Sequence, residues 1–182
     1  MQKQEMEFNF TDSAFHALRQ LITDQTGIEL PDHKKMLVYG RLAKRLRKLD
    51  LESFEQYIKT LEKEVKSGQQ DEMMHVVNAM TTNVTHFFRE QHHFDMLSDY
   101  LVKHGKDKAM CIWSSACSSG EEVWSIAMTA NELVKAGKIK PVRILASDLD
   151  TTILARAKAG EYKLSEDNFK SSALMKRYLK PL

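Results

Sequence analysis

The sequence predicts an all-α N-terminal domain followed by an α/β domain. Before residue 81, apolar side chains recur at the spacing of amphipathic helices. After residue 109, short apolar runs alternate with longer helical stretches, which is typical of parallel strands joined by helical crossovers. The length of 182 residues, with 42% hydrophobic and 29% charged residues, indicates a folded protein with a packed core.

The N-terminal region predicts four short helices that close a small bundle. The first follows capping candidates at 11–13, and the second opens at Pro31. The third ends near Gly68, and the fourth runs through 73–80. Brief turns between amphipathic helices favour a bundle over an extended arrangement.

Residues 81–90 break the helical spacing and bring several polar side chains together. We interpret them as a joint between two domains, so the expected domains are residues 1–80 and 91–182. Phe87 and Phe88 are expected to anchor this joint in the core.

The C-terminal domain is expected to alternate strands and helices. Strands are predicted at 110–114 and 142–147, and helices at 121–136 and 151–159. A helical crossover of this length makes a right-handed parallel unit, so the carboxyl ends of both strands should lie at one edge of the sheet.

A ligand site is predicted at that edge. The first strand leads into a run of small residues, 114–120, that opens directly into a helix, and small side chains let a ligand approach the backbone. Asp148 follows the second strand, where open α/β sheets bind ribose hydroxyls. Glu121 and Glu122 would repel phosphate, and suit instead a neutral or cationic ligand rich in hydroxyls and amines.

Three motifs in this order resemble the CheR family of chemotaxis receptor methyltransferases. They are Met80-Thr-Thr-Asn-Val-Thr-His-Phe-Phe-Arg-Glu90, Ile112-Trp-Ser-Ser-Ala-Cys-Ser-Ser-Gly-Glu-Glu122 and Ile144-Leu-Ala-Ser-Asp-Leu-Asp150. The resemblance covers essentially the whole chain. It implies the first part of a Rossmann-like sheet that binds S-adenosylmethionine, and methylation of glutamate carboxylates on methyl-accepting chemotaxis receptors.

The resemblance also implies roles for individual residues. Arg89 would lie at the reaction centre and orient a carboxylate through a bidentate contact. The expected cofactor contacts are Asn83, Thr85, Arg89, Ala116, Gly120, Glu122 and Asp148. Ala116 departs from the glycine that the family often has in this loop.

Each role has a structural alternative. Asn83 and Thr85 could serve as ordinary turn or capping residues, and Arg89 could form a surface ion pair. Asp148 could cap the helix that starts at Thr151, but Asp150 is better placed for that cap. We therefore predict Asp150 as the cap and Asp148 as the ligand.

A basic segment lies on an otherwise acidic molecule. Residues 33–48 hold seven of the 27 basic residues and no acid, which leaves 20 basic against 25 acidic residues elsewhere. A solvated helix face is the simplest interpretation, but the missing acids favour a partner of opposite sign. The lack of a DNA-binding motif disfavours nucleic acid, and the resemblance indicates the cytoplasmic helices of receptors. The expected docking residues are Lys34, Arg41, Lys44, Arg45 and Lys48.

Composition adds several expectations. The sequence has neither a spanning apolar segment nor a signal peptide, so a cytoplasmic protein is expected. Cys111 and Cys117 are expected to be small buried side chains, and Trp113 and Trp124 to be core residues. The histidines at 86, 92 and 93 lack ligands that would complete a metal site, so no metal is expected.

Relatives in the family continue well beyond residue 182, and two parallel strands alone leave apolar surface uncovered. We therefore expect either a fragment of a longer protein or a homodimer through the open sheet edge. Two functions follow: a methyltransferase, or a shortened non-catalytic receptor-binding or dimerising module that keeps the cofactor pocket.

Overall fold

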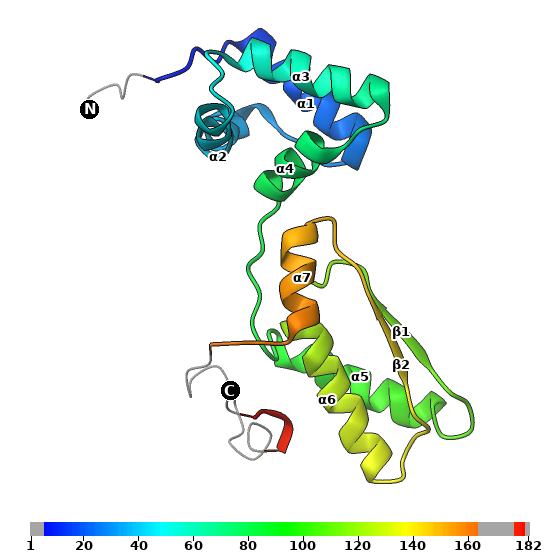
Figure 1. Ribbon diagram of the computed structural model, residues 1–182. Helices are drawn as coiled ribbons and strands as arrows, with labels where there is room; N and C mark the ends of the chain where they lie inside the picture. Colours follow the sequence, from blue (N-terminus) through cyan, green and yellow to red (C-terminus); the bar gives the residue numbers. More distant parts are fainter. Residues whose placement is uncertain (1–5, 164–176, 181–182) are drawn as a thin grey trace. The chain divides into compact units, whose positions relative to one another are not determined.

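The computed structural model describes residues 6–163 and 177–180, and it divides the chain into two compact units, Met1–Thr81 and Thr82–Leu182 (Figure 1). Each unit is described by itself below. Within the described residues, none of the helices has the length and apolar character needed to cross a membrane.

The first unit is all helical, as predicted. It contains α1 (Asp12–Thr26), a 3-10 turn (Asp32–Lys34), α2 (Lys35–Lys48), α3 (Phe54–Ser67) and α4 (Asp71–Met80). Side-chain oxygens of Thr11 and Ser53 cap the first turns of α1 and α3, and Gly27 and Gly68 end these helices in the left-handed conformation. The helix ends therefore follow from local side-chain chemistry.

The core of this unit is built around aromatic rings. The ring of Phe10 stacks on that of Phe54 with 4.0 Å between centroids. Leu18 from α1, Leu42 from α2 and Leu61 from α3 are completely buried beside them. Burial of such side chains supplies most of the stability of a small helical unit.

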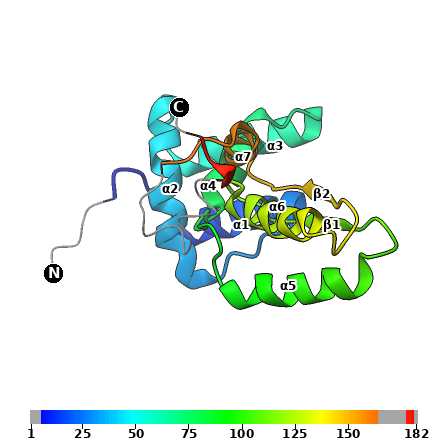
Figure 2. The ribbon, with the colours of Figure 1, turned by 90° about the horizontal axis from the view of Figure 1, so that it is seen from below.

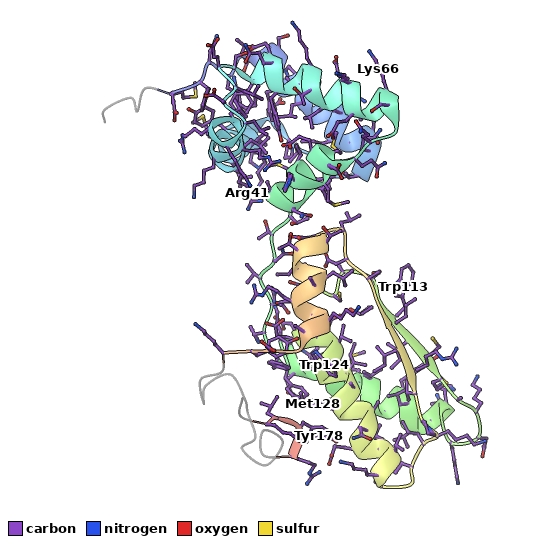
Figure 3. The ribbon with its side chains drawn as sticks, viewed as in Figure 1. Arg41, Lys66, Trp113, Trp124, Met128 and Tyr178 are labelled. Atoms are coloured by element: carbon purple, nitrogen blue, oxygen red, sulfur yellow. The ribbon has the colours of Figure 1, made fainter. Side chains whose placement is uncertain are left out.

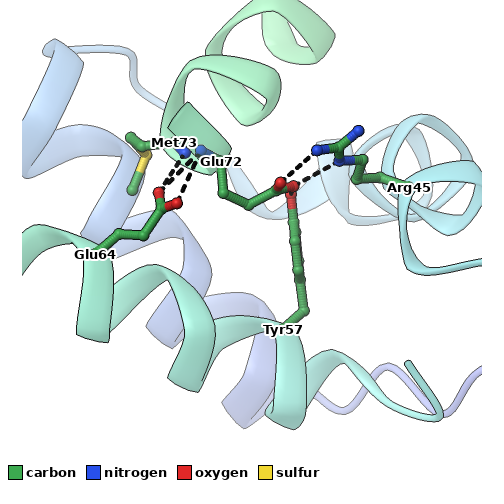
Figure 4. Close-up of polar contacts among 5 residues, drawn as sticks. All are labelled: Arg45, Tyr57, Glu64, Glu72 and Met73. Carbon is green, nitrogen blue, oxygen red and sulfur yellow. Dashed lines mark hydrogen bonds and ion pairs between the residues drawn. The ribbon is translucent and has the colours of Figure 1, made fainter. Parts of the chain in front are cut away.

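A buried carboxylate, Glu72, joins three of the helices (Figure 4). It accepts hydrogen bonds from Arg45 Nε of α2 and from the Tyr57 hydroxyl of α3, each at 2.7 Å. Glu64 of α3 in turn accepts the backbone N–H groups of Glu72 and Met73 at the start of α4. These side chains satisfy polar groups that would otherwise be costly to bury.

The second unit combines helices with a parallel pair of strands. Its elements are α5 (Gln91–His104), β1 (Cys111–Ser114), α6 (Glu121–Lys135), β2 (Arg143–Ala146) and α7 (Thr151–Ala159). The strands lie side by side in both views (Figures 1 and 2), with Cys111 opposite Arg143 and Ser114 opposite Ala146. The predicted order of strand, helix, strand and helix is confirmed.

Helices α5 and α6 pack against the sheet. Leu101 of α5, Ala130 of α6 and Ile139 form a buried cluster, against which Ile112 of β1 and Val142 pack. The side chains that alternate with these along the strands face the other way.

On the face of the sheet opposite α5 and α6, two residues that were predicted to be buried are exposed. Trp113 is 65% exposed, and Cys111 is exposed too, because both lie on the side of β1 that no described residue covers. Leu145 of β2 is exposed beside them. Cys117, in contrast, is buried as predicted.

Trp124 was also wrongly predicted to be core, since 42% of its surface is exposed. It borders a cavity of about 350 Å³ that is also lined by Met128 of α6, Tyr162 and Tyr178. Figure 3 labels Trp124, Met128 and Tyr178. Phe87 lies on another wall of this cavity and is buried against Met128, as an anchor should be.

Candidate functional site

The carboxyl ends of β1 and β2 meet, as the site prediction requires. The backbone N–H of Ser147 donates to the carbonyl of Ser114, and the N–H of Cys117 donates to the carbonyl of Ser147, both at 3.0 Å. The loop that follows each strand is therefore hydrogen-bonded to the other.

The small-residue loop turns sharply into α6. Gly120 has φ +97°, and a Cβ there would lie 2.8 Å from the Tyr162 hydroxyl and 2.9 Å from Cβ of Ala157. That hydroxyl donates to the carbonyl of Ser119 at 2.7 Å. Gly120 is thus required by packing against α7 and Tyr162, while Ala116 in the same loop is exposed.

The environment of Tyr162 favours its role as a donor. Burial, and then the nearby Glu121 carboxylate, raise the pKa of the Tyr162 phenol to about 12. The phenol stays protonated at neutral pH and keeps its hydrogen bond to the loop.

Asp148 holds the loop with its carboxylate. One oxygen accepts the backbone N–H of Ser118 at 2.7 Å, and the other accepts that of Asp150 at 2.9 Å. Each carboxylate oxygen can accept a second hydrogen bond, so Asp148 retains capacity for two ribose hydroxyls.

Glu122 lies in the first turn of α6 and accepts the hydroxyl of Ser114 at 2.9 Å. Burial, and then the charges of Asp148 and Glu122, raise the pKa of the Cys117 thiol. Glu122 is thus bonded to the last residue of β1, and Asp148 to the loop that follows β1.

Asn83 belongs to residues 81–90, called the linker from here on, and its side chain reaches the loop after β2. Its side-chain nitrogen donates to Oδ2 of Asp150 at 2.7 Å. Asp150 is 4% exposed and also caps α7 by accepting the N–H groups of Thr152 and Ile153. The cap prediction is confirmed, but its second role toward Asn83 was missed, because no local pattern links residues 67 positions apart.

Farther along the same segment, the backbone at Phe88 is bonded to α6. The N–H of Phe88 donates to Oγ of Ser125 at 3.0 Å. Arg89 is exposed, and its Nη1 donates to the carbonyl of Val84 at 2.7 Å. Thr85, which follows Val84 in the sequence, is half-buried. The proposed roles of Arg89 and Thr85 toward a ligand stay predictions.

The chemistry of the loop fits S-adenosylmethionine. The carboxylates of Glu121 and Glu122 suit a sulfonium and an ammonium group, and the carboxylate of Asp148 suits ribose hydroxyls. The hydroxyl oxygen of Ser118, a residue with φ +49°, is buried and has no hydrogen-bond partner among the described residues. Because buried hydroxyls are nearly always paired, this oxygen is a candidate partner for a polar group of the ligand.

The basic segment is partly used within the fold, which corrects the premise that it lacks acidic partners. Arg45 pairs with Glu72, Arg47 with Glu7 and Lys35 with Asp12. These acids come from other segments of the first unit, so the sequence of α2 alone does not reveal them. Arg45 is therefore a structural residue rather than a free docking group.

Arg41 is also engaged. Its Nη1 donates to the carbonyls of Ala79, Met80 and Thr81 at 3.0, 2.9 and 3.0 Å, and Figure 3 shows it directed toward α4. It thereby satisfies carbonyl groups at the C-terminal end of α4. Of the predicted docking residues, Lys34, Lys44 and Lys48 have exposed side chains.

Family models match both units. The CheR methyltransferase all-alpha domain matches residues 13–81, and the CheR methyltransferase SAM binding domain matches residues 83–181. The chain belongs to the CheR methyltransferase family. This confirms the resemblance drawn from the three motifs, the all-α plus partial Rossmann-like fold, and S-adenosylmethionine as the cofactor.

Curated relatives of CheR agree. The chain is 42% identical to the chemotaxis protein methyltransferase of Salmonella typhimurium over 92% of its length, and 39% identical to that of Escherichia coli over 92%. It is 42% identical to chemotaxis protein methyltransferase 2 of Pseudomonas aeruginosa over 94%. The match covers only 56%, 57% and 60% of these three relatives, respectively. The chain thus spans little more than half the length of the relatives.

Proposed function

We propose that this protein transfers the methyl group of S-adenosylmethionine to glutamate carboxylates of chemotaxis receptors, forming glutamyl methyl esters. The single observation that supports this most strongly is the meeting of Glu122, Asp148 and the Asn83 segment at the joined ends of β1 and β2. The relatives are named chemotaxis protein methyltransferases, which supports a substrate from chemotaxis.

The reaction asks little acid–base chemistry of the protein. A glutamate carboxylate is already ionised at neutral pH, so its oxygen can attack without a general base. The sulfonium supplies an electrophilic methyl group. The residues must hold donor and acceptor in line and exclude water, which contributes several kcal/mol to such reactions.

We assign the residues accordingly. Asp148 binds the ribose, and Glu122 faces the positively charged part of the donor, where opposite charges attract. Arg89 orients the acceptor carboxylate, because a guanidinium can bind both carboxylate oxygens in one plane. Asn83 and Thr85 of the linker complete the wall of the cofactor site.

Exposed lysines of α2 and of the 3-10 turn before it provide the docking surface. Lys44 and Lys48 of α2 and Lys34 of the turn are exposed and suit a receptor helix rich in glutamate. Such charges increase the encounter rate and select the partner more than they add affinity. The proposed acceptor carboxylates belong to the cytoplasmic helices of the receptors, so we place the protein in the cytoplasm.

The test is methyl transfer from radiolabelled S-adenosylmethionine to receptor-containing membranes. We expect base-labile label on the receptor, and its loss in the Arg89→Ala variant. A chain that binds S-adenosylhomocysteine but transfers no methyl group would instead be a non-catalytic receptor-binding module.

A homodimer through the open sheet edges is a second proposal. Among the described residues, β1 and β2 pair only with each other, and unpaired edges favour association. Sedimentation as a monomer at micromolar concentration would contradict it.

A further inference from the structure

A single buried carboxylate connects the linker to the strand ends. Asp150 accepts the Asn83 side chain on Oδ2, and the N–H groups of Thr152 and Ile153 on Oδ1. One residue therefore ends β2's loop, starts α7 and anchors a segment that lies 67 positions earlier.

The contacts continue from Asp150 into the cofactor loop. The N–H of Asp150 donates to Oδ1 of Asp148, whose Oδ2 accepts the N–H of Ser118. The path Asn83, Asp150, Asp148, Ser118 thus links the three segments that the proposed site uses. Each donor or acceptor in it is held by a bond of 2.7 to 2.9 Å.

We propose that Asp150 is a positioning residue for the cofactor site, a role beyond its helix cap. Through Asn83 it holds the linker, with Thr85 and Arg89, against the end of β2. The cofactor side of this inference rests on the proposed function, but the anchoring of the linker does not.

The alternative is that Asp150 only caps α7. The two roles separate chemically, because an asparagine side chain is as good a cap as an aspartate. In Asp150→Asn one oxygen can still accept the N–H groups of α7. Its amide nitrogen would then face the amide nitrogen of Asn83. Contact is regained only if the Asn83 amide turns its oxygen inward, and the bond is then a weaker one between neutral groups.

The first measurement is hydrogen exchange of peptides covering residues 82–90 without cofactor. We expect exchange in Asp150→Asn to be about tenfold faster than in the unmodified chain, and the Asn83→Asp/Asp150→Asn double variant to restore protection, because the donor and acceptor are then exchanged. Thr11→Asn, which changes the cap of α1, is the matched control and should leave these peptides unchanged.

The second measurement is calorimetric titration with S-adenosylhomocysteine. We expect Asp150→Asn to weaken binding about tenfold while the thermal unfolding midpoint of the protein stays within a few degrees. Should Asp150→Asn fail to fold, Asn83→Ala removes the same bond and leaves the cap intact, and it should give the same faster exchange.

Unchanged exchange in both Asp150→Asn and Asn83→Ala would overturn the inference, and so would faster exchange with undiminished affinity for S-adenosylhomocysteine. If the unmodified chain binds no S-adenosylhomocysteine, the proposed function fails, and the exchange experiment still decides whether Asp150 anchors the linker.

Discussion

Glu72 shows how a single residue can link helices that are separate in the sequence. Burial alone would raise the pKa of its carboxyl group, but hydrogen bonds from Arg45 and Tyr57 outweigh burial and lower it. Burial, followed by the bond to Glu72, raises the pKa of the Tyr57 phenol. The ionised carboxylate and the neutral phenol are thus the stable forms in the folded protein.

Replacing Arg45 with alanine should therefore be costly. It leaves a carboxylate that is 8% exposed without its cation, and the expected loss in free energy of unfolding is about 3 kcal/mol. Lys44→Ala, on the exposed part of the same helix, should change it by less than about 0.5 kcal/mol. Urea unfolding of both variants measures the difference, and equal losses would contradict the account.

The lowered pKa of Glu72 also predicts a dependence on pH. A carboxyl group that ionises more easily when folded stabilises the protein above its unfolded pKa of about 4.3. That stabilisation is lost as the pH falls through the lower pKa of the folded state. Glu72→Gln should be less stable at pH 7 and lose less stability between about pH 5 and 3. Identical pH profiles for the two proteins would contradict the assignment.

At the scale of elements, local chemistry was enough to predict most helices. Thr11, Ser53 and Asp150 each cap a helix, and Gly27, Gly68 and Gly160 each end one. The strands were each predicted slightly too long. The exposed face with Trp113 could not be predicted, because alternation along a strand shows that a side chain faces one side but not whether that side is covered.

Gly120 and Gly137 offer a matched test of the loop. Both have positive φ, but a Cβ at Gly120 would lie within 3.0 Å of Tyr162 and Ala157, whereas nothing lies within 4 Å at Gly137. We expect Gly137→Ala to cost about 1 kcal/mol from backbone strain alone. Gly120→Ala should cost about 1–3 kcal/mol more, because the methyl group overpacks the loop. Thermal unfolding compares them, and similar losses would show that the loop is not packed as described.

At the scale of the whole molecule, the rule that parallel strands end at a common edge was sufficient to predict that the loops after β1 and β2 lie together. Asp148 was expected there, and it lies at the joined strand ends. The partners of Asn83 and Arg45 could not be predicted, because they depend on contacts between distant segments. Most of residues 163–182, whose fold the sequence did not predict, lie outside the described residues.

The proposed docking surface predicts an effect of charge that depends on salt. The single variants Lys44→Glu and Lys48→Glu should each weaken binding to receptor helices about tenfold at low ionic strength. The effect should be smaller near 0.5 M salt, because ions there screen charges within about a few ångströms. Lys66→Glu, on α3, is the control for a change in net charge (Figure 3). Equal weakening by all three substitutions would point to net charge rather than to a docking surface.

The cofactor pocket itself is tested most directly by calorimetric titration of the 182-residue chain with S-adenosylhomocysteine. We predict one binding site per chain, and at least about tenfold weaker binding in Asp148→Ala, which loses about 1.4 kcal/mol or more of binding free energy. Absence of heat with the unmodified chain, or an affinity that Asp148→Ala leaves unchanged, would contradict a donor site at the joined strand ends.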